Sequence, residues 1–530
     1  MPYYIVHAGT ALKKLATAGT FSAITLPAGV TVSDLRRTRF AILDRWIVCV
    51  NAPSVNVVID ATDLTTHLLS LAAPTTTLLA ATGAAGNPNG VYRYKYTFAI
   101  LSGTTVITES PFSPESLPIT LTNVKGTLTS IDVATGGLGV THRRIYRTTN
   151  GGADYYLLAT ITDNTTTTYT DDSTDYDLAL LASVEARGNP PGVDSTDRLR
   201  LIAPWKDRLW ASPVNDPDDI LFTANREIYA WPAINQFTAK PVGEDEIGVT
   251  AFIPRRDELL VGKRARLLKV IGDSIANFQM VSVIEGIGPQ SQESTVVVRD
   301  SVYFLGEDGF YEYGPSGLVS LTRDSVHPWF TTDTYFERAL FSEAFAKWNP
   351  LYDVIDLHLA AAGSLAIDRW VSFDLKTRKW WGPHKTDAFT PTIAILGRDD
   401  DDALIPIMGS SAGHVYTANR ATFSDDTTAI AFDVTTKFHG ANTPDIEKHW
   451  GELAVISKIE PAGSLTITPK IGGLDAAAGT ALTHDLTSGR ERLARVGQGR
   501  YCQLRFQEST AAQGVELFGY EIPFHELGRR

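Results

Sequence analysis

One string of this chain, GSSAG at residues 409–413, matches the G-x-S-x-G pattern of serine hydrolases. Ser411 would be a nucleophile if it stood on a sharp turn between a strand and a helix, where the hydroxyl is exposed to substrate. The residues that follow, HVYTAN, have the character of a strand. We therefore expect a tight turn between two strands, and no nucleophile.

Acidic residues are the second candidates for chemistry, as cation ligands or as a catalytic pair. The run Asp399 to Asp402 lacks the alternation and the central glycine of a calcium loop, so we expect a solvated turn. The same interpretation applies to a loop that carries Asp171, Asp172, Asp175 and Asp177. Glycoside hydrolysis needs two facing carboxylates, and Glu307, Asp308 and Asp368 show no such arrangement in the sequence.

Other catalytic patterns are missing from the sequence. The 11 histidines are scattered, without an i,i+4 pair or an H-E-x-x-H frame. The chain has neither a Walker A sequence nor G-x-G-x-x-G. The sequence therefore predicts no catalytic residue, no cofactor-binding residue, no metal ligand and no enzymatic activity.

Positive charge is most concentrated at Arg255 and Arg256, and at Lys263, Arg264 and Arg266. The first interpretation is that these side chains lie on solvated hairpin turns. The sharper hypothesis is a contact with another subunit or with DNA. The net charge of −13 argues against a protein that coats DNA, because such affinity rests on Lys and Arg neutralising phosphates. An acidic surface can still line a channel through which DNA passes.

The composition is that of an ordinary globular protein, with 43% hydrophobic and 20% charged residues. Its two cysteines, Cys49 and Cys502, are too few for a disulfide scaffold. Both occur in apolar, strand-like contexts, so we expect buried free thiols. The N-terminal residues do not resemble a secretory signal, and no apolar run is long enough to span a membrane. We expect a protein made in a reducing cytoplasm, without a membrane span.

Short apolar runs punctuated by Gly and Pro predict an all-β fold. SVYFLGEDGFYEYG (301–314) predicts a β-hairpin around Asp308-Gly309. Similar strand–turn–strand units occur along the chain, the first at 44–60. Those with turns near residues 215, 263, 308, 377 and 412 follow at intervals of roughly 35 to 70 residues, which is typical of a β-propeller with loop insertions. The stretch 334–348 is compatible with a helix or a strand pair.

Several of the predicted strands, among them VYFL, LLV and WVSF, are apolar on both faces, as expected for strands between blades. The aromatic residues expected to pack between blades are Tyr303, Phe304, Phe310, Tyr311, Trp380 and Trp381.

Residues 73–186 differ from the blades. They begin with a Thr/Ala/Gly/Pro-rich stretch that we interpret as a linker, followed by a strand with Tyr92, Tyr94, Tyr96 and Phe98 on one face. Further strands are predicted at 144–147, at 155–161 and near Tyr169. The segment resembles fibronectin type III modules, whose later strands commonly read Tyr-x-Arg, then a Gly turn, then a Tyr/Leu strand.

The last part of the chain has alternating strands at 452–460, 464–472, 501–509 and 515–527. The predicted fold is thus an all-β β-propeller with an inserted fibronectin III/Ig-like β-sandwich and a C-terminal β-sandwich or closing sheet. The expected division is an N-terminal propeller segment at 1–72, the inserted sandwich at 73–186, the main blades at 187–435 and the C-terminal domain at 436–530.

Three stretches of the blade region resemble one family of phage proteins. They are KDRLWASPVNDPDDILFTANREIYAWP, DELLVGKRARLLKVIG and SVIEGIGPQSQESTVVVRDSVYFLGEDGFYEY. The C-terminal GRYCQLRFQES and VELFGYEIPFHELGRR also resemble the closing sheet of that family. The family is that of the tail nozzle (tail tubular protein B) and packaged-DNA stabilisation proteins of short-tailed bacteriophages. The fibronectin-like insert and the short N-terminal segment depart from its pattern.

This resemblance implies a virion structural protein of the tail, assembled in the host cytoplasm. It would form a ring, usually a homohexamer, below the portal and adaptor proteins of the head-to-tail connector. The channel of the ring would retain packaged phage DNA and permit its ejection. Tail fibre or spike proteins are further expected partners.

Two alternatives come from other functional classes. A glycan-binding or glycan-degrading β-propeller would act on a host surface and would need a pocket with paired carboxylates. An adhesion or scaffold protein built from fibronectin-like modules would need an export signal, which the sequence does not show.

Overall fold

The computed structural model of the chain describes residues 4–15, 19–28, 30–51, 54, 56–135, 139–180, 198–232, 234–239, 248–386, 388–398, 402–418, 424–473, 475–510 and 513–527. The chain forms two compact units, Met1–Ala346 and Lys347–Arg530. The division falls inside strand β27 (Phe345–Asn349).

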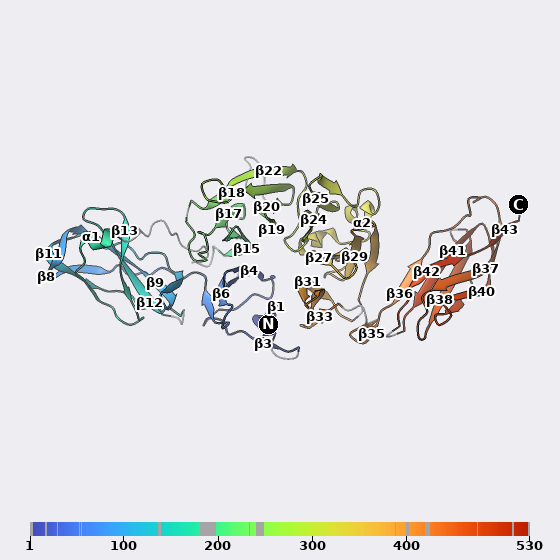
Figure 1. Cartoon of the computed structure of the whole chain (residues 1–530), viewed down its shortest axis with the longest axis horizontal. Coiled ribbons are helices and arrows are strands. Elements are labelled where there is room, and N and C mark those ends of the chain that lie inside the picture. Colours follow the sequence, from blue (N-terminus) through green and yellow to red (C-terminus); the bar gives the residue numbers. More distant parts are fainter. Residues whose placement is uncertain are drawn as a thin grey trace. The chain divides into compact units, whose positions relative to one another are not determined.

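The fold is all-β, as the sequence predicted, with antiparallel sheets that follow one another along the chain (Figure 1). Helix in the described residues is limited to α1 (Asp175–Ala179), α2 (His327–Thr331) and the 3-10 helix η2 (Arg338–Glu343). The stretch 334–348, left open between helix and strands, contains η2 and most of β27.

Four sheets of the first unit share one topology, in which four strands pair in chain order. The first consists of β4 (Arg39–Leu43), β5 (Trp46–Val50), β6 (Val57–Asp60) and β7 (Thr66–Leu68). The second consists of β15 (Leu199–Trp205), β16 (Arg208–Pro213), β17 (Asp219–Phe222) and β18 (Gln236–Thr238). The third consists of β19 (Ala251–Pro254), β20 (Glu258–Lys263), β21 (Arg266–Ile271) and β22 (Gln279–Glu285). The fourth consists of β23 (Thr295–Val298), β24 (Ser301–Leu305), β25 (Phe310–Gly314) and β26 (Gly317–Ser320).

The hydrophobic cores of the first unit lie between consecutive sheets. The first strands are neighbours, since β15 packs against β4 and β19, and β19 packs against β23. Successive side chains of one strand belong to the hydrophobic cores on opposite faces of its sheet. In β15, Leu201 belongs to the core shared with the third sheet and Ile202 to the core shared with the first. In β20, Leu259 and Leu260 are divided in the same way between the second and fourth sheets.

A sheet covered on both faces by neighbouring sheets is the arrangement of a propeller blade, and it explains why the strands are continuously apolar. The predicted β-propeller fold is therefore confirmed. The outer face of the first sheet is covered by a smaller sheet of β1 (Ile5–Ala8), β2 (Ala11–Leu15) and β3 (Phe21–Ala23). Cys49 is buried in this core as a free thiol, as predicted, and Cys502 is likewise free and buried.

Two further sheets with the same chain-order pairing follow. One is formed by β27, β28 (Val354–Leu359), β29 (Arg369–Asp374) and β30 (Trp380–His384). The other is formed by β31 (Pro391–Arg398), β32 (Leu404–Ser410) and β33 (Val415–Thr417). A short hairpin of β34 (Ser424–Asp425) and β35 (Thr428–Ala429) comes next.

Most of the aromatic residues predicted to pack between blades are buried, namely Tyr303, Phe304, Phe310 and Tyr311. Trp380 is half-buried, with its ring centre 5.1 Å from that of Phe373. The prediction for Trp381 is wrong, because this side chain is 56% exposed. The reason is that β30 is the last strand of its sheet and successive side chains of a strand point to opposite faces.

Between β7 and β15 the chain forms two sheets around one core. One sheet pairs β10 (Thr105–Glu109), β9 (Tyr94–Ser102), β12 (His142–Thr148) and β13 (Tyr155–Ile161). The other pairs β14 (Tyr169–Asp171), β11 (Ile119–Thr129) and β8 (Leu79–Tyr92). The predicted tyrosine face is buried in the shared core. The predicted linker is wrong, because strand β8 occupies it and pairs with β11 through backbone groups that need no apolar side chains.

Charged groups are buried inside this sandwich. The Arg147 side chain is fully buried and lies 2.7 Å from the Asp171 carboxylate, which also accepts a hydrogen bond from the Tyr94 hydroxyl at 2.8 Å. Burial and the Asp171 charge both raise the pKa of Tyr94, so this hydroxyl keeps its proton and remains a donor. Arg144 pairs with Glu109 in the same sheet. These pairs connect strands that are distant in sequence. The relationship of the sandwich to fibronectin III modules stays a prediction.

The C-terminal strands form a second pair of sheets. One pairs β36 (Phe432–Thr435), β41 (Tyr501–Glu508), β38 (Ser464–Gly472) and β39 (Leu482–Asp485). The other pairs β40 (Arg490–Gly499), β37 (Lys448–Ser457) and β42 (Leu517–Glu521), with β43 (Phe524–Glu526) also on β37. One core contains residues of both sheets, so this part is a β-sandwich. The strands predicted at 452–460, 464–472 and 501–509 are present as β37, β38 and β41, whereas the single strand predicted at 515–527 is divided into β42 and β43.

The buried ion pair of Arg147 yields a stability prediction. Asp171→Ala leaves the fully buried guanidinium of Arg147 with Asp175, at 2.9 Å, as its remaining carboxylate partner, and we expect a local loss of about 3 kcal/mol, because removing one partner of a buried ion pair is costly. Amide hydrogen exchange of β9 and β12, measured by mass spectrometry on the full chain, should accelerate. Asp177→Ala is the matched control, because this exposed carboxylate accepts a hydrogen bond from Thr174 on the surface and its loss should leave exchange unchanged. Equal acceleration in the two variants would contradict the buried role of Asp171.

Candidate functional site

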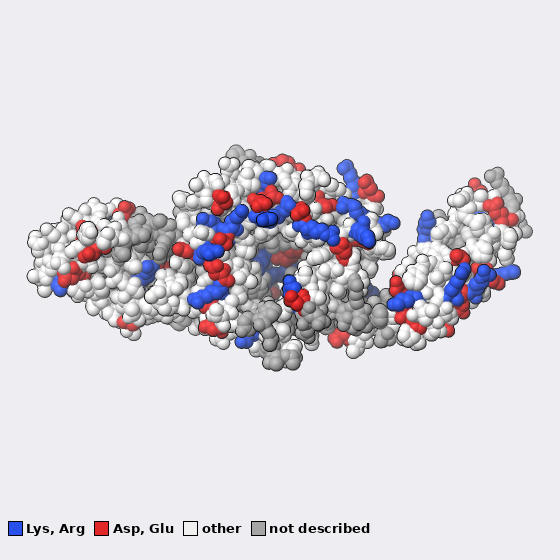
Figure 2. Space-filling view, viewed as in Figure 1, with Lys and Arg blue, Asp and Glu red and all other residues white. Residues whose placement is uncertain are grey.

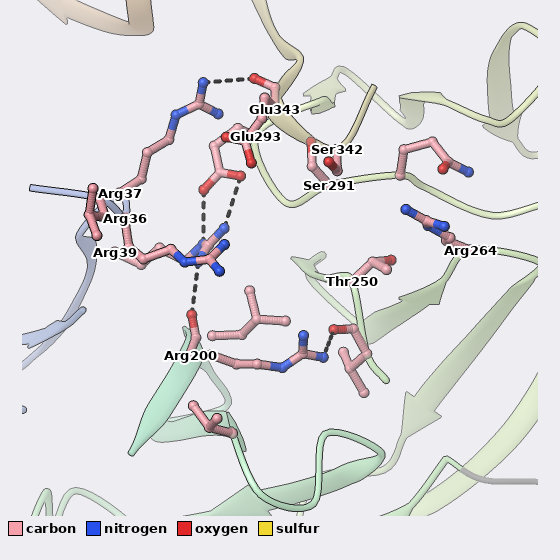
Figure 3. A pocket seen from close by; sticks show the side chains of 15 residues that line it. Arg36, Arg37, Arg39, Arg200, Thr250, Arg264, Ser291, Glu293, Ser342 and Glu343 are labelled. Carbon is pink, nitrogen blue, oxygen red and sulfur yellow. Dashed lines mark hydrogen bonds and ion pairs between the residues drawn. The ribbon is translucent and has the colours of Figure 1, made fainter. Parts of the chain in front are cut away.

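Five arginines line one cavity of the first unit, which has a volume of about 550 Å³ (Figure 3). They are Arg36, Arg37, Arg39, Arg200 and Arg264. Two acidic residues, Glu293 and Glu343, are also part of the lining. We refer to this cavity as the arginine pocket.

The blade strands bring these residues together. Arg39 is the first residue of β4, Arg200 is the second residue of β15, and Thr250 directly precedes β19. Because β15 packs against both β4 and β19, the beginnings of the three strands meet at one end of the sheets. Arg264 is in the turn between β20 and β21, and Glu293 lies in the segment before β23. The pocket is therefore assembled from residues in or next to the four blade sheets of the first unit.

Arg39 is fully engaged within the pocket. Its Nε and Nη2 lie 2.8 and 3.1 Å from the two carboxylate oxygens of Glu293, and its Nη1 donates to the Arg200 carbonyl at 2.9 Å. Arg37 donates one hydrogen bond, from Nη2 to the Glu343 carbonyl at 2.7 Å. Arg200 donates to the carbonyl of Val249. Backbone carbonyls thus hold two of the guanidinium groups without neutralising their charge.

The pocket keeps an excess of positive charge. Five arginines against two glutamates leave three positive charges among the described lining residues. Burial lowers the pKa of Arg200 to about 10, with the nearby Arg39 charge acting in the same direction and Asp218 opposing it. Burial also lowers the pKa of Arg37, against the opposing charges of Glu293 and Glu343. The site therefore disfavours further positive charge and favours an anion.

Of these five arginines, only Arg264 belongs to the basic clusters that the sequence indicated. The run DLRRTRF at 34–40 is the signal for the three arginines at and just before the start of β4, and these residues meet Arg200 only because β15 packs against β4. The basic residues that the sequence predicted to lie together on one turn have different environments in the structure. Lys263 is buried and lies 3.0 Å from Asp218, so its placement on a solvated turn was wrong, because its side chain points between the sheets. Arg266 pairs with Glu285 across the β21–β22 ladder.

The other basic pair lies at the opposite end of the third sheet. Arg255 forms an ion pair with Glu258 at 2.6 Å, and Arg256 is exposed in the turn between β19 and β20. On the face shown in Figure 2, Lys and Arg are interspersed with Asp and Glu over the sheets of the first unit, without one large patch of either sign.

Ser411 lies in the exposed turn between β32 and β33, which confirms the predicted strand–turn–strand context. Of the acidic run, Asp399 to Asp401 fall outside the described residues, and Asp402 is exposed and pairs with Arg398 at 3.2 Å. The loop at 171–177 is only partly solvated. The prediction is wrong for Asp171, which is fully buried because Arg147 compensates its charge.

The three carboxylates weighed for glycan chemistry have separate partners. Glu307 is exposed, Asp308 accepts a hydrogen bond from the Tyr311 hydroxyl at 2.5 Å, and Asp368 accepts one from the Ala361 amide at 2.8 Å. The described part of the chain contains no group of three or more His, Cys, Asp or Glu side chains placed to hold a metal ion.

A second constellation lies in the C-terminal sandwich and was missed by the sequence analysis. Oγ of Ser457 is 2.9 Å from Nε2 of His484, whose Nδ1 is 3.0 Å from a carboxylate oxygen of Glu491. An ionised carboxylate only accepts, so Nδ1–H donates to Glu491 and the Ser457 hydroxyl donates to Nε2. These are the distances of a serine hydrolase triad, and no local sequence pattern connects three residues on β37, β39 and β40.

Access argues against catalysis by this triad. Ser457 is 4% exposed and His484 is fully buried, whereas the Glu491 side chain is 35% exposed. In a hydrolase the nucleophile must reach substrate and the carboxylate is the shielded group. Here the serine is buried and the carboxylate is partly exposed, so the three groups serve as hydrogen-bond partners for one another inside the sandwich.

Comparisons with known proteins give no family. No protein-family model and no curated protein matches the chain. Among solved structures, PorZ of the type-IX secretion system of Porphyromonas gingivalis is similar at 10% identity and a TM-score of 0.29, over 99% of this chain and 80% of PorZ. The N-terminal part of BBS1, solved in complex with ARL6, is similar at 11% identity and a TM-score of 0.28, over 66% of this chain and 98% of that one.

A third similar structure is an exo-β-1,3-galactanase of Phanerochaete chrysosporium, at 9% identity and a TM-score of 0.20, over 74% of this chain and 96% of the galactanase. All three TM-scores are too low to support an inference about function. None of the helices in the described ranges has the length and hydrophobicity needed to cross a bilayer.

The buried triad leads to a prediction for labelling and stability. We expect a fluorophosphonate probe to label neither Ser457 nor Ser411 in the native chain. Ser457→Ala should destabilise the C-terminal sandwich by about 1–3 kcal/mol, because the buried His484 loses a hydrogen-bond partner. Hydrogen exchange of β37 and β39 measures this loss, with Ser411→Ala as the exposed control. Probe labelling that disappears in Ser457→Ala would contradict the structural role and establish a nucleophile.

Proposed function

We propose that the protein is a structural protein of the bacteriophage tail that forms a nozzle-like ring below the portal and adaptor. One observation carries this proposal. The three blade stretches that resemble the nozzle family cover the two middle strands of three consecutive sheets, β16–β17, β20–β21 and β24–β25. The resemblance therefore follows the structural repeat, which is how similarity between propellers with short blade motifs should be distributed.

Ring assembly requires surfaces that bind a second copy in a head-to-tail manner and close. The strands β18, β22 and β26 each end their sheets and present backbone groups on one side. The sandwich of β8–β14 adds a second surface, and its face visible in Figure 2 carries few charged side chains. We propose these as contacts to neighbouring subunits and to tail fibre or spike proteins.

In this function the protein resides in the virion tail after assembly in the host cytoplasm, and its ring retains the packaged genome until ejection. The role is structural and needs no catalytic residue. A glycan-degrading propeller would instead need two facing carboxylates in a pocket. Within the arginine pocket, one of the two glutamates, Glu293, is held by both of its oxygens to Arg39, so no observation favours that alternative.

The proposed function predicts a ring of six copies and its place in the particle. Native mass spectrometry and negative-stain microscopy of the full chain should show closed homohexamers. An epitope tag inserted after Gly103, in the exposed turn between β9 and β10, should allow gold labelling of the tail. The same tag inserted after Gly413, in the β32–β33 turn of the second unit, is the matched control for the effect of the insertion itself. A strictly monomeric protein that is absent from virions would contradict the proposal.

A further inference from the structure

The arginine pocket contains donors without acceptors. Nε of Arg200 and Nε2 of Gln290 are buried and have no hydrogen-bond partner among the described residues. Gln290 is 7% exposed and, like Arg200, lines the pocket. A buried donor left without a partner costs about 1–3 kcal/mol. These two donors belong to residues that line one cavity, which points to a ligand that supplies oxygen acceptors.

The charges of the pocket specify the sign of that ligand. Glu293 neutralises Arg39, whereas Arg37 and Arg200 are held by backbone carbonyls and keep their charge. Figure 3 shows the guanidinium groups of Arg37 and Arg39 on one side and that of Arg264 on the other, with that of Arg200 between them at the bottom of the view. Like charges gathered in a partly desolvated site destabilise one another, and a bound anion relieves this repulsion.

The arrangement of the donors specifies the shape of the ligand. A carboxylate is planar and is satisfied by the fork of a single arginine, as Glu293 is by Arg39. The remaining donors come from β15, from the β20–β21 turn and from the segment before β23, so they approach from different directions. A tetrahedral oxyanion presents acceptors in all of these directions and carries more charge.

We propose that the arginine pocket binds a phosphate group, either as free inorganic phosphate or as a phosphate of a nucleic-acid strand. The volume of about 550 Å³ exceeds that of one phosphate and leaves room for an attached group. Guanidinium groups recognise phosphate with charge-assisted hydrogen bonds. This ligand site is independent of the tail function, because it is formed by residues of the first unit alone.

Calorimetric titration of the full chain with inorganic phosphate, at constant ionic strength in chloride, tests the site. We expect saturable binding with one phosphate per chain. Arg264→Ala should weaken the affinity about tenfold, the effect of losing one charge-assisted hydrogen bond. Arg264 is exposed on a turn, so the variant should retain the fold.

Arg256→Ala is the matched control, since it removes the same charge from the turn at the opposite end of the same sheet and should leave the affinity unchanged. The absence of saturable phosphate binding, or equal weakening by Arg256→Ala and Arg264→Ala, would overturn the proposal.

A second arm distinguishes the two sources of the phosphate. Fluorescence anisotropy measures binding of a 5′-phosphorylated oligothymidylate and its competition by inorganic phosphate. Displacement by phosphate, with weaker binding to Arg264→Ala, assigns the site to a nucleic-acid strand. Saturable phosphate binding without oligonucleotide binding assigns it to the free anion. A chain that binds phosphate as a monomer would refute the ring but not the pocket, so the two proposals fail separately.

Discussion

The first unit depends on the burial of its sheets on both faces. In β20, neighbouring residues Leu259 and Leu260 are fully buried in two different cores, one shared with the preceding sheet and one with the following sheet. A single four-stranded sheet with two apolar faces has no stable existence in water, because each face must be covered. The stability of each blade is therefore a property of its neighbours, and the first strands of the blades are forced to lie side by side.

This constraint creates the arginine pocket. Side chains at the beginnings of neighbouring first strands have to meet, and here they include Arg39 and Arg200. The ion pair of Arg39 and Glu293 joins residues 254 positions apart and connects the first sheet to the segment before the fourth. The hydrogen bond from Arg37 to the Glu343 carbonyl spans 306 positions. Blade packing places these groups, and the same contacts then restrain the blades relative to one another.

The two sandwiches show how buried polar groups can be structural. Arg147 with Asp171, and Ser457 with His484 and Glu491, have polar partners on other strands. Burial makes each partner necessary, since an unpaired group in a low-dielectric core is costly. The geometry of the second set is that of a catalytic triad, and only the burial of Ser457 distinguishes the two roles. The arginine pocket differs from both, because its arginines outnumber the acidic side chains among the described lining residues.

The sequence by itself determined the all-β fold, the blade hairpins such as β24–β25, and the tyrosine face of β9, because period-two alternation and turn residues are local signals. It did not reveal β8, whose Ala/Gly/Thr-rich residues pair through the backbone, or the exposure of Trp381 on an outer strand. The tertiary structure alone decided which of the scattered arginines meet, that Lys263 is buried, and that Ser457, His484 and Glu491 are in contact. These contacts depend on pairings between strands that are far apart in the sequence, and a local pattern of residue types does not indicate such pairings.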